Sequence, residues 1–268
     1  MKNIVFITAL KSPTNEARSF GYQYSIDIWK VWCRANKCEL KVLDEPLFDY
    51  SEMKPNFYRY YCFELLKDEE FDQICLVDAD TIIHPDCPNF FELTDHKFTV
   101  VHNDGDYDWI IRSIENYQFE FPDEFNFKFD IWKYFNSGFM VLNQKHKYIF
   151  DILLDFYWSM PEKIREVQKK YGVGTDQPLI NLFVQRSQVD LTILPYQFNM
   201  QDLERKNILD DRLLFTTIPG IYHFNAVSGG PNQVNYWMKR TYDYFYNSPS
   251  NLGDAIINAW DKTRKIHG

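Results

Sequence analysis

Short apolar runs recur along the chain, and polar or turn-forming residues bound each of them. Runs of this length and composition are typical of buried strands. We predict strands at 4–7, 39–43, 74–77, 99–103, 139–142, 189–194 and 220–225. A segment with helical spacing, 24–35, separates the first two runs, and this order of elements gives parallel strands joined by a right-handed crossover. The pattern therefore predicts an α/β fold with a mostly parallel central sheet.

Helical spacing of apolar residues marks most of the remaining elements. We predict helices at 53–67, 85–93, 146–170, 231–246 and 253–265, a helix that begins near Thr175 as its N-cap, and a loop at 12–15. The segment 107–133 is aromatic, acidic and weakly periodic, so we expect an elaboration over a cleft. Because no linker rich in Gly, Ser or Pro interrupts the chain, we expect residues 1–268 to form one domain.

Two carboxylates follow the run Ile74-Cys75-Leu76-Val77 at its carboxyl end. Residues i and i+2 of an extended chain point to the same side, so Asp78 and Asp80 direct their oxygens at one place. Like charges this close repel unless a cation lies between them, and a hard divalent ion is the simplest candidate. Open α/β sheets bind ligands at this edge. The alternative is that Asp-x-Asp is only a polar turn.

Composition limits the classes of partner. The formal net charge is -9 and the pI is near 5.2, so no basic stripe is available for nucleic acid. The 5 cysteines form no Cys-x-x-Cys pair, and we expect reduced thiols in a cytoplasmic protein. The apolar run 4–10 is too short for a signal peptide or a transmembrane segment, and we expect the first strand there.

Further polar residues stand where strands end or helices begin, and each has a structural alternative. Arg59 lies in a predicted helix and is either a site residue or a surface residue that extends its charge into solvent. Asp176 and Gln177 open a helix and could bind sugar hydroxyls, although capping of the helix is favoured. His223 lies in a short apolar strand, where a histidine is more often structural than a metal ligand.

In this order the motifs resemble those of GT-A glycosyltransferases, closest to glycosyltransferase family 8, which includes the glycogenin-like and lipopolysaccharide galactosyltransferase-like enzymes. The matching pieces are Arg59, then 75–81, which contains Asp-Ala-Asp, then 135–143, which contains Asn-Ser-Gly, then 176–181 and 222–224. They cover most of the chain, from about residue 4 to 224. The resemblance implies a GT-A domain, a Rossmann-like nucleotide-diphospho-sugar transferase fold.

The resemblance also implies a division of the chain and a role for individual residues. Residues 1–103 would form the nucleotide-binding half with the metal motif, 104–230 the donor-sugar and acceptor half, and 231–268 C-terminal helices. Asp78, Asp80 and His223 would bind Mn²⁺, with Mg²⁺ as a substitute. The catalytic residues would be Asn136, Asp176 and Gln177, which face the donor sugar, and donor contacts would come from Thr8, Ala9, Arg59, Asp78, Ser137 and, by a looser match, Asp104.

One departure from the family pattern concerns the residues after His223. The family continues with Gly-x-Lys-Pro-Trp, whose lysine holds the diphosphate. Here the continuation at 225–230 is Asn-Ala-Val-Ser-Gly-Gly, and the next cations are Lys239 and Arg240. The cation that binds the diphosphate is therefore unassigned.

The activity implied is metal-dependent transfer of a hexose from a nucleoside diphosphate sugar, with UDP expected, to a hydroxyl of a glycan, lipid-linked or protein acceptor. The family favours retention, whereas an inverting enzyme would need Asp176 or Asp104 as general base. Two alternatives remain. One is a haloacid dehalogenase-like phosphatase with Asp78 as nucleophile and Asp80 as acid/base, although that motif normally ends the first strand. The other is a non-catalytic sugar-nucleotide or glycan-binding module.

Overall fold

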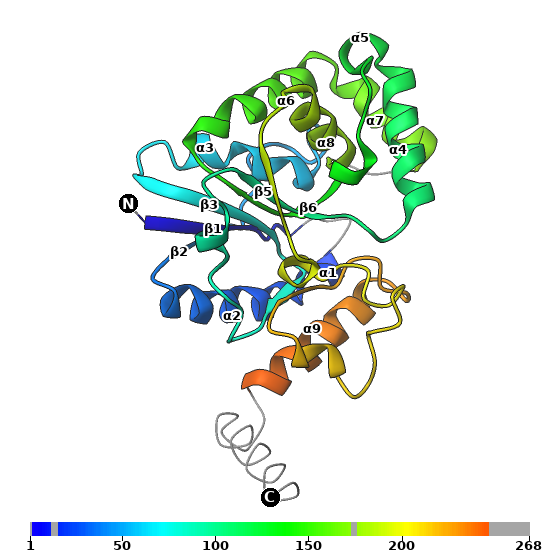
Figure 1. Cartoon of the computed structure of the whole chain (residues 1–268). Coiled ribbons are helices and arrows are strands. Elements are labelled where there is room, and N and C mark those ends of the chain that lie inside the picture. Colours follow the sequence, from blue (N-terminus) through cyan, green and yellow to red (C-terminus); the bar gives the residue numbers. More distant parts are fainter. Residues whose placement is uncertain (1, 12–15, 173–175, 247–268) are drawn as a thin grey trace, which may run out of the picture.

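The apolar runs form the six-stranded sheet at the centre of the molecule (Figure 1). The computed structural model describes residues 2–11, 16–172 and 176–246. The strand order is β2-β1-β3-β6-β5-β7. Their bounds are β1 Lys2–Thr8, β2 Glu39–Leu43, β3 Phe71–Asp78, β5 Phe98–His102, β6 Phe135–Leu142 and β7 Leu191–Leu194. The predicted loop at 12–15, the N-cap Thr175 and the helix at 253–265 lie outside the described residues.

The direction of the strands confirms a mostly parallel α/β sheet. β1 runs parallel to β2 and β3, and β5 runs parallel to β7. β6 is antiparallel to both β3 and β5, with Val77 opposite Phe139. Because β6 is reversed, its first residues lie at the carboxyl end of β3, beside Asp78.

A second, two-stranded sheet joins distant parts of the chain. β4 (Thr81–Ile83) follows the Asp-Ala-Asp sequence directly, and β8 (Ile221–His223) pairs with it antiparallel. In this register Thr81 lies opposite His223. The pairing therefore brings the histidine to the carboxyl end of β3.

Helices cover both faces of the central sheet (Figure 1). On one face lie α3 (Cys62–Leu65), α4 (Tyr107–Glu120), α5 (Pro122–Phe125), α6 (Lys147–Ser159), α7 (Pro161–Tyr171) and α8 (Gln177–Arg186), and on the other α1 (Glu16–Ser19), α2 (Tyr22–Ala35) and α9 (Pro231–Tyr246). Side chains alternate along β1, so Ile4 and Phe6 enter one hydrophobic core whereas Val5 and Ile7 enter the other. Burial on both faces explains the continuous apolar runs in the sequence.

The prediction of one α-helix at 53–67 is wrong. A 3₁₀ helix, η1 (Pro55–Tyr61), occupies most of it, and α3 follows. Four consecutive side chains, at 57–60, are buried. An amphipathic α-helix cannot bury four residues in a row on one face, whereas a tight 3₁₀ segment enclosed by protein can.

The predicted helix at 146–170 is two helices. α6 ends before Met160, which has φ -151° and ψ 53°, and α7 begins at Pro161. Proline disfavours the helical conformation of the residue before it and is accepted at the first helical position, so the break falls at this pair.

Other boundaries also differ from the predicted ones. In place of the expected helix at 85–93 there is only the 3₁₀ helix η2 (Phe90–Leu93). The weakly periodic segment 107–133 contains the regular helix α4. The N-cap of α4, Asp106, accepts a hydrogen bond from the backbone N–H of Trp109 at 3.0 Å. The remaining short 3₁₀ segments are η3 (Ile131–Lys133), η4 (Gln144–His146), η5 (Tyr196–Asn199) and η6 (Leu214–Thr217).

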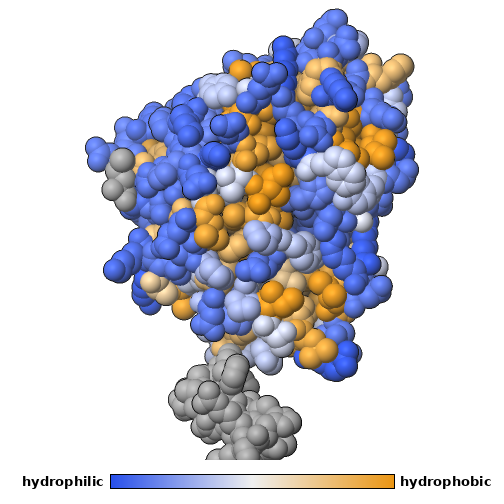
Figure 2. Space-filling view, in the orientation of Figure 1, coloured by the Kyte–Doolittle hydropathy of each residue, from blue (hydrophilic) through white to orange (hydrophobic). Residues whose placement is uncertain are grey.

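The face of the molecule drawn in Figure 2 is mainly hydrophilic, with smaller hydrophobic patches. All five cysteines are free, as predicted. In the described part of the chain, none of the helices combines the length and the apolar character that crossing a membrane requires.

Phe90 joins the helical layer to the sheet, and we expect it to be a main contributor to stability. Its ring stacks on Trp32 of α2 at 4.9 Å and meets Phe139 of β6 edge-on at 5.2 Å. Phe90→Ala should lower the free energy of unfolding by about 3–5 kcal/mol, measured by urea denaturation. Phe119→Ala, where the residue is 75% exposed, should change it by less than about 0.5 kcal/mol. Equal effects of the two substitutions would contradict this account.

Candidate active site

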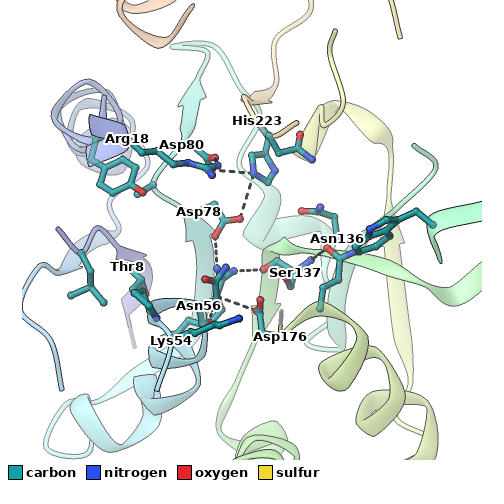
Figure 3. Close-up of a pocket in the computed structure, with 18 residues that line it drawn as sticks. Thr8, Arg18, Lys54, Asn56, Asp78, Asp80, Asn136, Ser137, Asp176 and His223 are labelled. Carbon is teal, nitrogen blue, oxygen red and sulfur yellow. Dashed lines mark hydrogen bonds and ion pairs between the residues drawn. The ribbon is translucent and has the colours of Figure 1, made fainter. Parts of the chain in front are cut away.

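A cavity of about 600 Å³ opens at the carboxyl ends of β1 and β3, beside the first residues of β6 (Figure 3). Its volume is within the range of sites that bind small molecules and cofactors. The lining residues are Thr8, Leu10, Arg18, Tyr22, Lys54, Pro55, Asn56, Arg59, Asp78, Ala79, Asp80, Trp109, Asn136, Ser137, Asp176, Gln177, His223 and Asn225.

The two carboxylates and the histidine form a cluster on the wall of this cavity. His223 Nε2 lies 3.4 Å from Asp78 Oδ2 and 3.2 Å from Asp80 Oδ1. Asp80 and His223 are almost fully buried, and one ligand atom from each of the three residues lies within 4.8 Å of the others. The Asp-x-Asp motif therefore belongs to a cluster of side chains at the cavity and is not a simple polar turn.

A chain of hydrogen bonds fixes which nitrogen of His223 faces the carboxylates. The backbone N–H of Gly138 donates to Asn136 Oδ1 at 2.9 Å, so this atom is the acceptor. Asn199 Nδ2 donates to the same oxygen at 3.0 Å, and its Oδ1 lies 3.1 Å from His223 Nδ1. His223 Nδ1 therefore carries a proton, and Nε2 faces Asp78 and Asp80. A histidine held in this way is oriented as metal-ligating histidines are.

The cluster fits a divalent ion. Two carboxylates and an imidazole suit Mn²⁺ or Mg²⁺. In octahedral coordination with bonds of about 2.1 Å, neighbouring ligand atoms are about 3 Å apart. The distances from His223 Nε2 to the two carboxylates, 3.2 and 3.4 Å, are close to this value. Asp78, Asp80 and His223 could hold such an ion with little rearrangement.

Opposite charges compensate the buried groups of the cluster. Burial opposes the charged form of Asp80, but Arg18 and His223 outweigh it and lower the pKa of the Asp80 carboxyl group. Burial likewise opposes protonation of His223, but Asp80, and to a smaller extent Asp78, raise the pKa of the imidazole. In the absence of a metal ion, the imidazole of His223 and the guanidinium of Arg18 therefore both lie against Asp80 and favour its ionised form.

Arg59 is buried and has a fixed place in the wall of the cavity, so the alternative of a surface residue with its charge in solvent is wrong. Its guanidinium donates to Asp78 Oδ1 at 2.5 Å and to the carbonyl of Ser137 at 2.6 Å. It also lies 3.6 Å from Asp176 Oδ2, and its Nε donates to the carbonyl of Asn56 at 3.1 Å. Arg59 thus connects η1, β3, β6 and α8 at one point.

Asp176 and Gln177 do not cap α8 with their side chains, contrary to the favoured prediction. Asp176 is at the N-cap position but makes no side-chain capping bond, and its Oδ2 accepts a hydrogen bond from the hydroxyl of Tyr60 at 2.8 Å. Gln177 Oε1 accepts from the backbone N–H of Ser137 at 3.2 Å. Both residues therefore face the start of β6 and line the cavity.

Gly138 allows these groups to approach one another. A Cβ atom at this position would lie 2.5 Å from Cε1 of His223 and 2.6 Å from Oδ2 of Asp78, closer than real side chains come. The cluster therefore requires a residue without a side chain at position 138. This requirement is steric and does not come from a turn of the backbone.

Of three further residues that were predicted to contact the donor, only Thr8 lines the cavity. Its hydroxyl oxygen has no hydrogen-bond partner among the described residues. Ala9 is buried in a hydrophobic core, and its N–H donates to Leu43 at 2.8 Å. Asp104 is not among the lining residues and forms an ion pair with Lys206 at 2.8 Å.

Sequence reasoning did not find Arg18, Lys54, Trp109 and Asn199. Arg18 forms an ion pair with Asp80, and Lys54 and Trp109 line the cavity. Each comes from a part of the chain without a recognisable motif, and only the fold brings them together. The one available signal was the missing lysine after His223, which left the cation that binds the diphosphate unassigned.

We expect Arg59 to be essential for stability because it balances two carboxylates. Arg59→Met should lower the free energy of unfolding by about 3–5 kcal/mol in urea denaturation, since it leaves Asp78 and Asp176 without their cation. The double variant Arg59→Met/Asp176→Asn should recover part of this loss, because one unbalanced charge is removed with it. A change of less than about 0.5 kcal/mol in Arg59→Met would indicate a surface-like ion pair instead.

Solved glycosyltransferase structures resemble this chain, and the one with a TM-score of 0.50 supports the GT-A fold. A glycosyltransferase involved in glycosylation of the major capsid of PBCV-1 aligns with a TM-score of 0.50 at 10% identity, covering 90% of this chain and 100% of its own. Mouse xyloside xylosyltransferase 1 aligns with a TM-score of 0.46 at 15% identity, covering 84% of this chain and 98% of its own. No curated protein sequence matches the chain.

The family itself is shown by a sequence match. The model of Glycosyl transferase family 8 matches residues 11–228, which include both carboxylates, the Asn-Ser-Gly segment, α8 and His223. Since this match spans much more than half of the chain, the protein is a glycosyltransferase and belongs to Glycosyl transferase family 8.

Proposed function

We propose that the protein transfers a hexose from a UDP-sugar to a hydroxyl group of an acceptor, with retention at the anomeric carbon and with a divalent metal ion. The observation that carries this proposal is the cluster of Asp78, Asp80 and His223 on the wall of a cavity of about 600 Å³. Within Glycosyl transferase family 8, neither the phosphatase nor the binding-module alternative is favoured.

The cluster would hold Mn²⁺ or Mg²⁺ next to the diphosphate of the donor. A bound ion of this kind acts as a Lewis acid that stabilises the charge developing on the leaving diphosphate. The chain's own contribution is to fix the ligands before the donor arrives, since His223 is oriented by Asn199 and Asp78 is held by Arg59.

The donor would lie across the carboxyl ends of β1 and β3. Thr8, a lining residue at the carboxyl end of β1, would lie beside the nucleoside. Asn136, Asp176 and Gln177 would surround the hexose at the start of β6 and α8. Their side chains are already held by protein hydrogen bonds, so they can orient the sugar without first being ordered, which is a contribution from positioning. Domain boundaries within this arrangement would follow the predicted halves, 1–103 and 104–230.

The acceptor would approach across the surface of α4 and η3. These elements adjoin the wall of the cavity. Trp109, in the first turn of α4, lines the cavity. Beyond it, Trp132 is 67% exposed, and its ring lies 5.7 Å from that of Tyr107 and 6.5 Å from that of His102. Such an exposed group of rings suits stacking against a sugar of a glycan acceptor.

Removal of the metal ligand tests the donor reaction. Purified protein with Mn²⁺ should release UDP from UDP-glucose or UDP-galactose, and EDTA or Asp80→Ala should lower the rate by about 100-fold or more, because metal stabilisation of the leaving group is worth several kcal/mol. Asp72→Ala is the matched control, since Asp72 lies on the same strand with a side chain 38% exposed. Rates unaffected by both EDTA and Asp80→Ala would contradict the proposal.

The same preparation distinguishes the alternatives. Raised thermal stability with UDP-sugars but no release of UDP would favour a binding module. Trapping of an acyl-phosphate analogue by fluoroberyllate would favour the phosphatase. NMR of the transferred sugar would decide between retention and inversion.

Trp132→Ala tests the acceptor surface. With the best acceptor from a panel of methyl glycosides, the variant should raise the KM for the acceptor about threefold to tenfold and leave UDP release without acceptor unchanged, because a stacking contact is worth about 0.5–1.5 kcal/mol. Phe119→Ala removes another exposed ring, at the opposite end of α4, and should change neither quantity. An equal effect of the two variants would contradict the assignment.

A further inference from the structure

The cavity has three lining residues with a permanent positive charge among those the structure describes, Arg18, Lys54 and Arg59. Two of them are already engaged. Arg59 is 6% exposed and donates to Asp78 and to two backbone carbonyls. Lys54 donates to Gln168 Oε1 at 2.8 Å. Neither can turn toward a ligand without giving up these contacts.

Arg18 is held in a different way. It lies on the short helix α1, and its side chain is 35% exposed, whereas that of its partner Asp80 is 6% exposed. Within the described chain, Asp80 is the only acceptor that its guanidinium contacts. The backbone of α1 is anchored separately, because the side chain of Asn235 on α9 donates to the carbonyl of Ala17. The backbone of α1 is thus held independently of the pair between Arg18 and Asp80, which lies at the cavity (Figure 3).

Arg18 would share the carboxylate of Asp80 with a bound metal ion. Its guanidinium contacts Oδ2 of Asp80, while His223 Nε2 lies 3.2 Å from Oδ1. A divalent ion bound to Asp78, Asp80 and His223 would bring two further positive charges to the same carboxylate. Two cations on one buried carboxylate repel each other, so the ion would weaken or displace the pair between Arg18 and Asp80.

The charges of the cavity indicate where a displaced guanidinium would go. Asp78, Asp80 and Asp176 balance the three cations of the lining. A divalent ion would leave a surplus of positive charge, and a diphosphate would restore the balance. The planar guanidinium is well suited to bind phosphate oxygens with two parallel hydrogen bonds.

Among the described residues, the segment after His223 contributes no cation to the lining of the cavity. Residues 224–238 contain neither lysine nor arginine. Lys239 of α9 is 57% exposed, forms an ion pair with Asp243 in its own helix, and is not among the residues lining the cavity. The diphosphate therefore needs a cation from another part of the chain.

We propose that Arg18 is this cation: it rests on Asp80 while the metal site is empty, and when a divalent ion takes the carboxylate it turns to bind the diphosphate of the donor. The inference rests on the proposed function, because it assumes both the ion and the nucleotide. It assigns Arg18 a double role, as a competitor of the metal ion and as a ligand of the phosphate.

The two roles predict effects of opposite sign in Arg18→Ala. Mn²⁺ alone should bind roughly fivefold more tightly than to the unmodified protein, since the competing guanidinium is gone. UDP in the presence of saturating Mn²⁺ should bind roughly tenfold to hundredfold more weakly, since charge-assisted hydrogen bonds to phosphate are lost. Free Mn²⁺ is measured by electron paramagnetic resonance and UDP binding by titration calorimetry, so neither readout needs turnover.

Matched variants separate this account from a general change in charge or packing. Arg212→Ala removes the same charge from a side chain that is 75% exposed and outside the lining, and it should change neither affinity. Arg18→Lys keeps the charge but loses the planar fork, so UDP should bind more weakly than to the unmodified protein but more tightly than to Arg18→Ala. If Arg18→Ala fails to fold, Arg18→Lys alone decides by its weaker binding of UDP.

Three results would overturn the inference. Weaker Mn²⁺ and weaker UDP binding in Arg18→Ala would show that Arg18 only supports the shape of the site. Unchanged UDP affinity in the folded Arg18 variants would show that Arg18 does not contact the phosphate. If the unmodified protein bound neither Mn²⁺ nor UDP, the proposed function itself would fail, and the inference with it.

Discussion

The structure depends on the charge balance of two carboxylates that leave the central strand side by side. Asp78 and Asp80 would repel each other if nothing lay between and around them. Arg59 is placed on one, Arg18 on the other, and His223 touches both. The residues that supply this compensation come from η1, α1 and β8, so the folding of distant segments around β3 and the neutralisation of the pair are one event.

Backbone geometry makes this concentration of charge possible. The reversed β6 presents its first residues to the carboxyl end of β3, and Gly138 leaves room there for the ring of His223 and the carboxylate of Asp78. The same backbone supplies acceptors and donors: the carbonyl of Ser137 holds Arg59, and its N–H holds Gln177. Two neighbouring residues at the start of one strand thus provide the steric gap, the acceptor and the donor.

The local patterns in the sequence were sufficient for the sheet and for the acidic motif. β2 and α9 have the predicted bounds, and Asp78 and Asp80 do meet at the carboxyl end of a buried strand. The α/β class followed from the apolar runs, and the family followed from the resemblance that the order of the motifs carries. Placing His223 beside Asp80 required the resemblance, since no periodicity shows that 221–223 pairs with 81–83.

The remainder depended on contacts between residues far apart in the chain. Arg18 belongs to a helix of four residues that has no periodicity to recognise. The 3₁₀ conformation of η1 results from burial on all sides, which propensity does not reveal. Asp176 was expected to cap its helix because that is what such a residue does in isolation, and the hydroxyl of Tyr60 changed the outcome.

The pairing of β4 with β8 has a consequence for biosynthesis. Strand β4 is made early, whereas His223 leaves the ribosome only after all six strands of the central sheet have been made. Because chains fold from the amino-terminal end as they are synthesised, an incomplete chain can assemble the carboxylates and the sheet without the imidazole. We expect the nascent protein to lack the complete cluster of Asp78, Asp80 and His223 until β8 reaches β4.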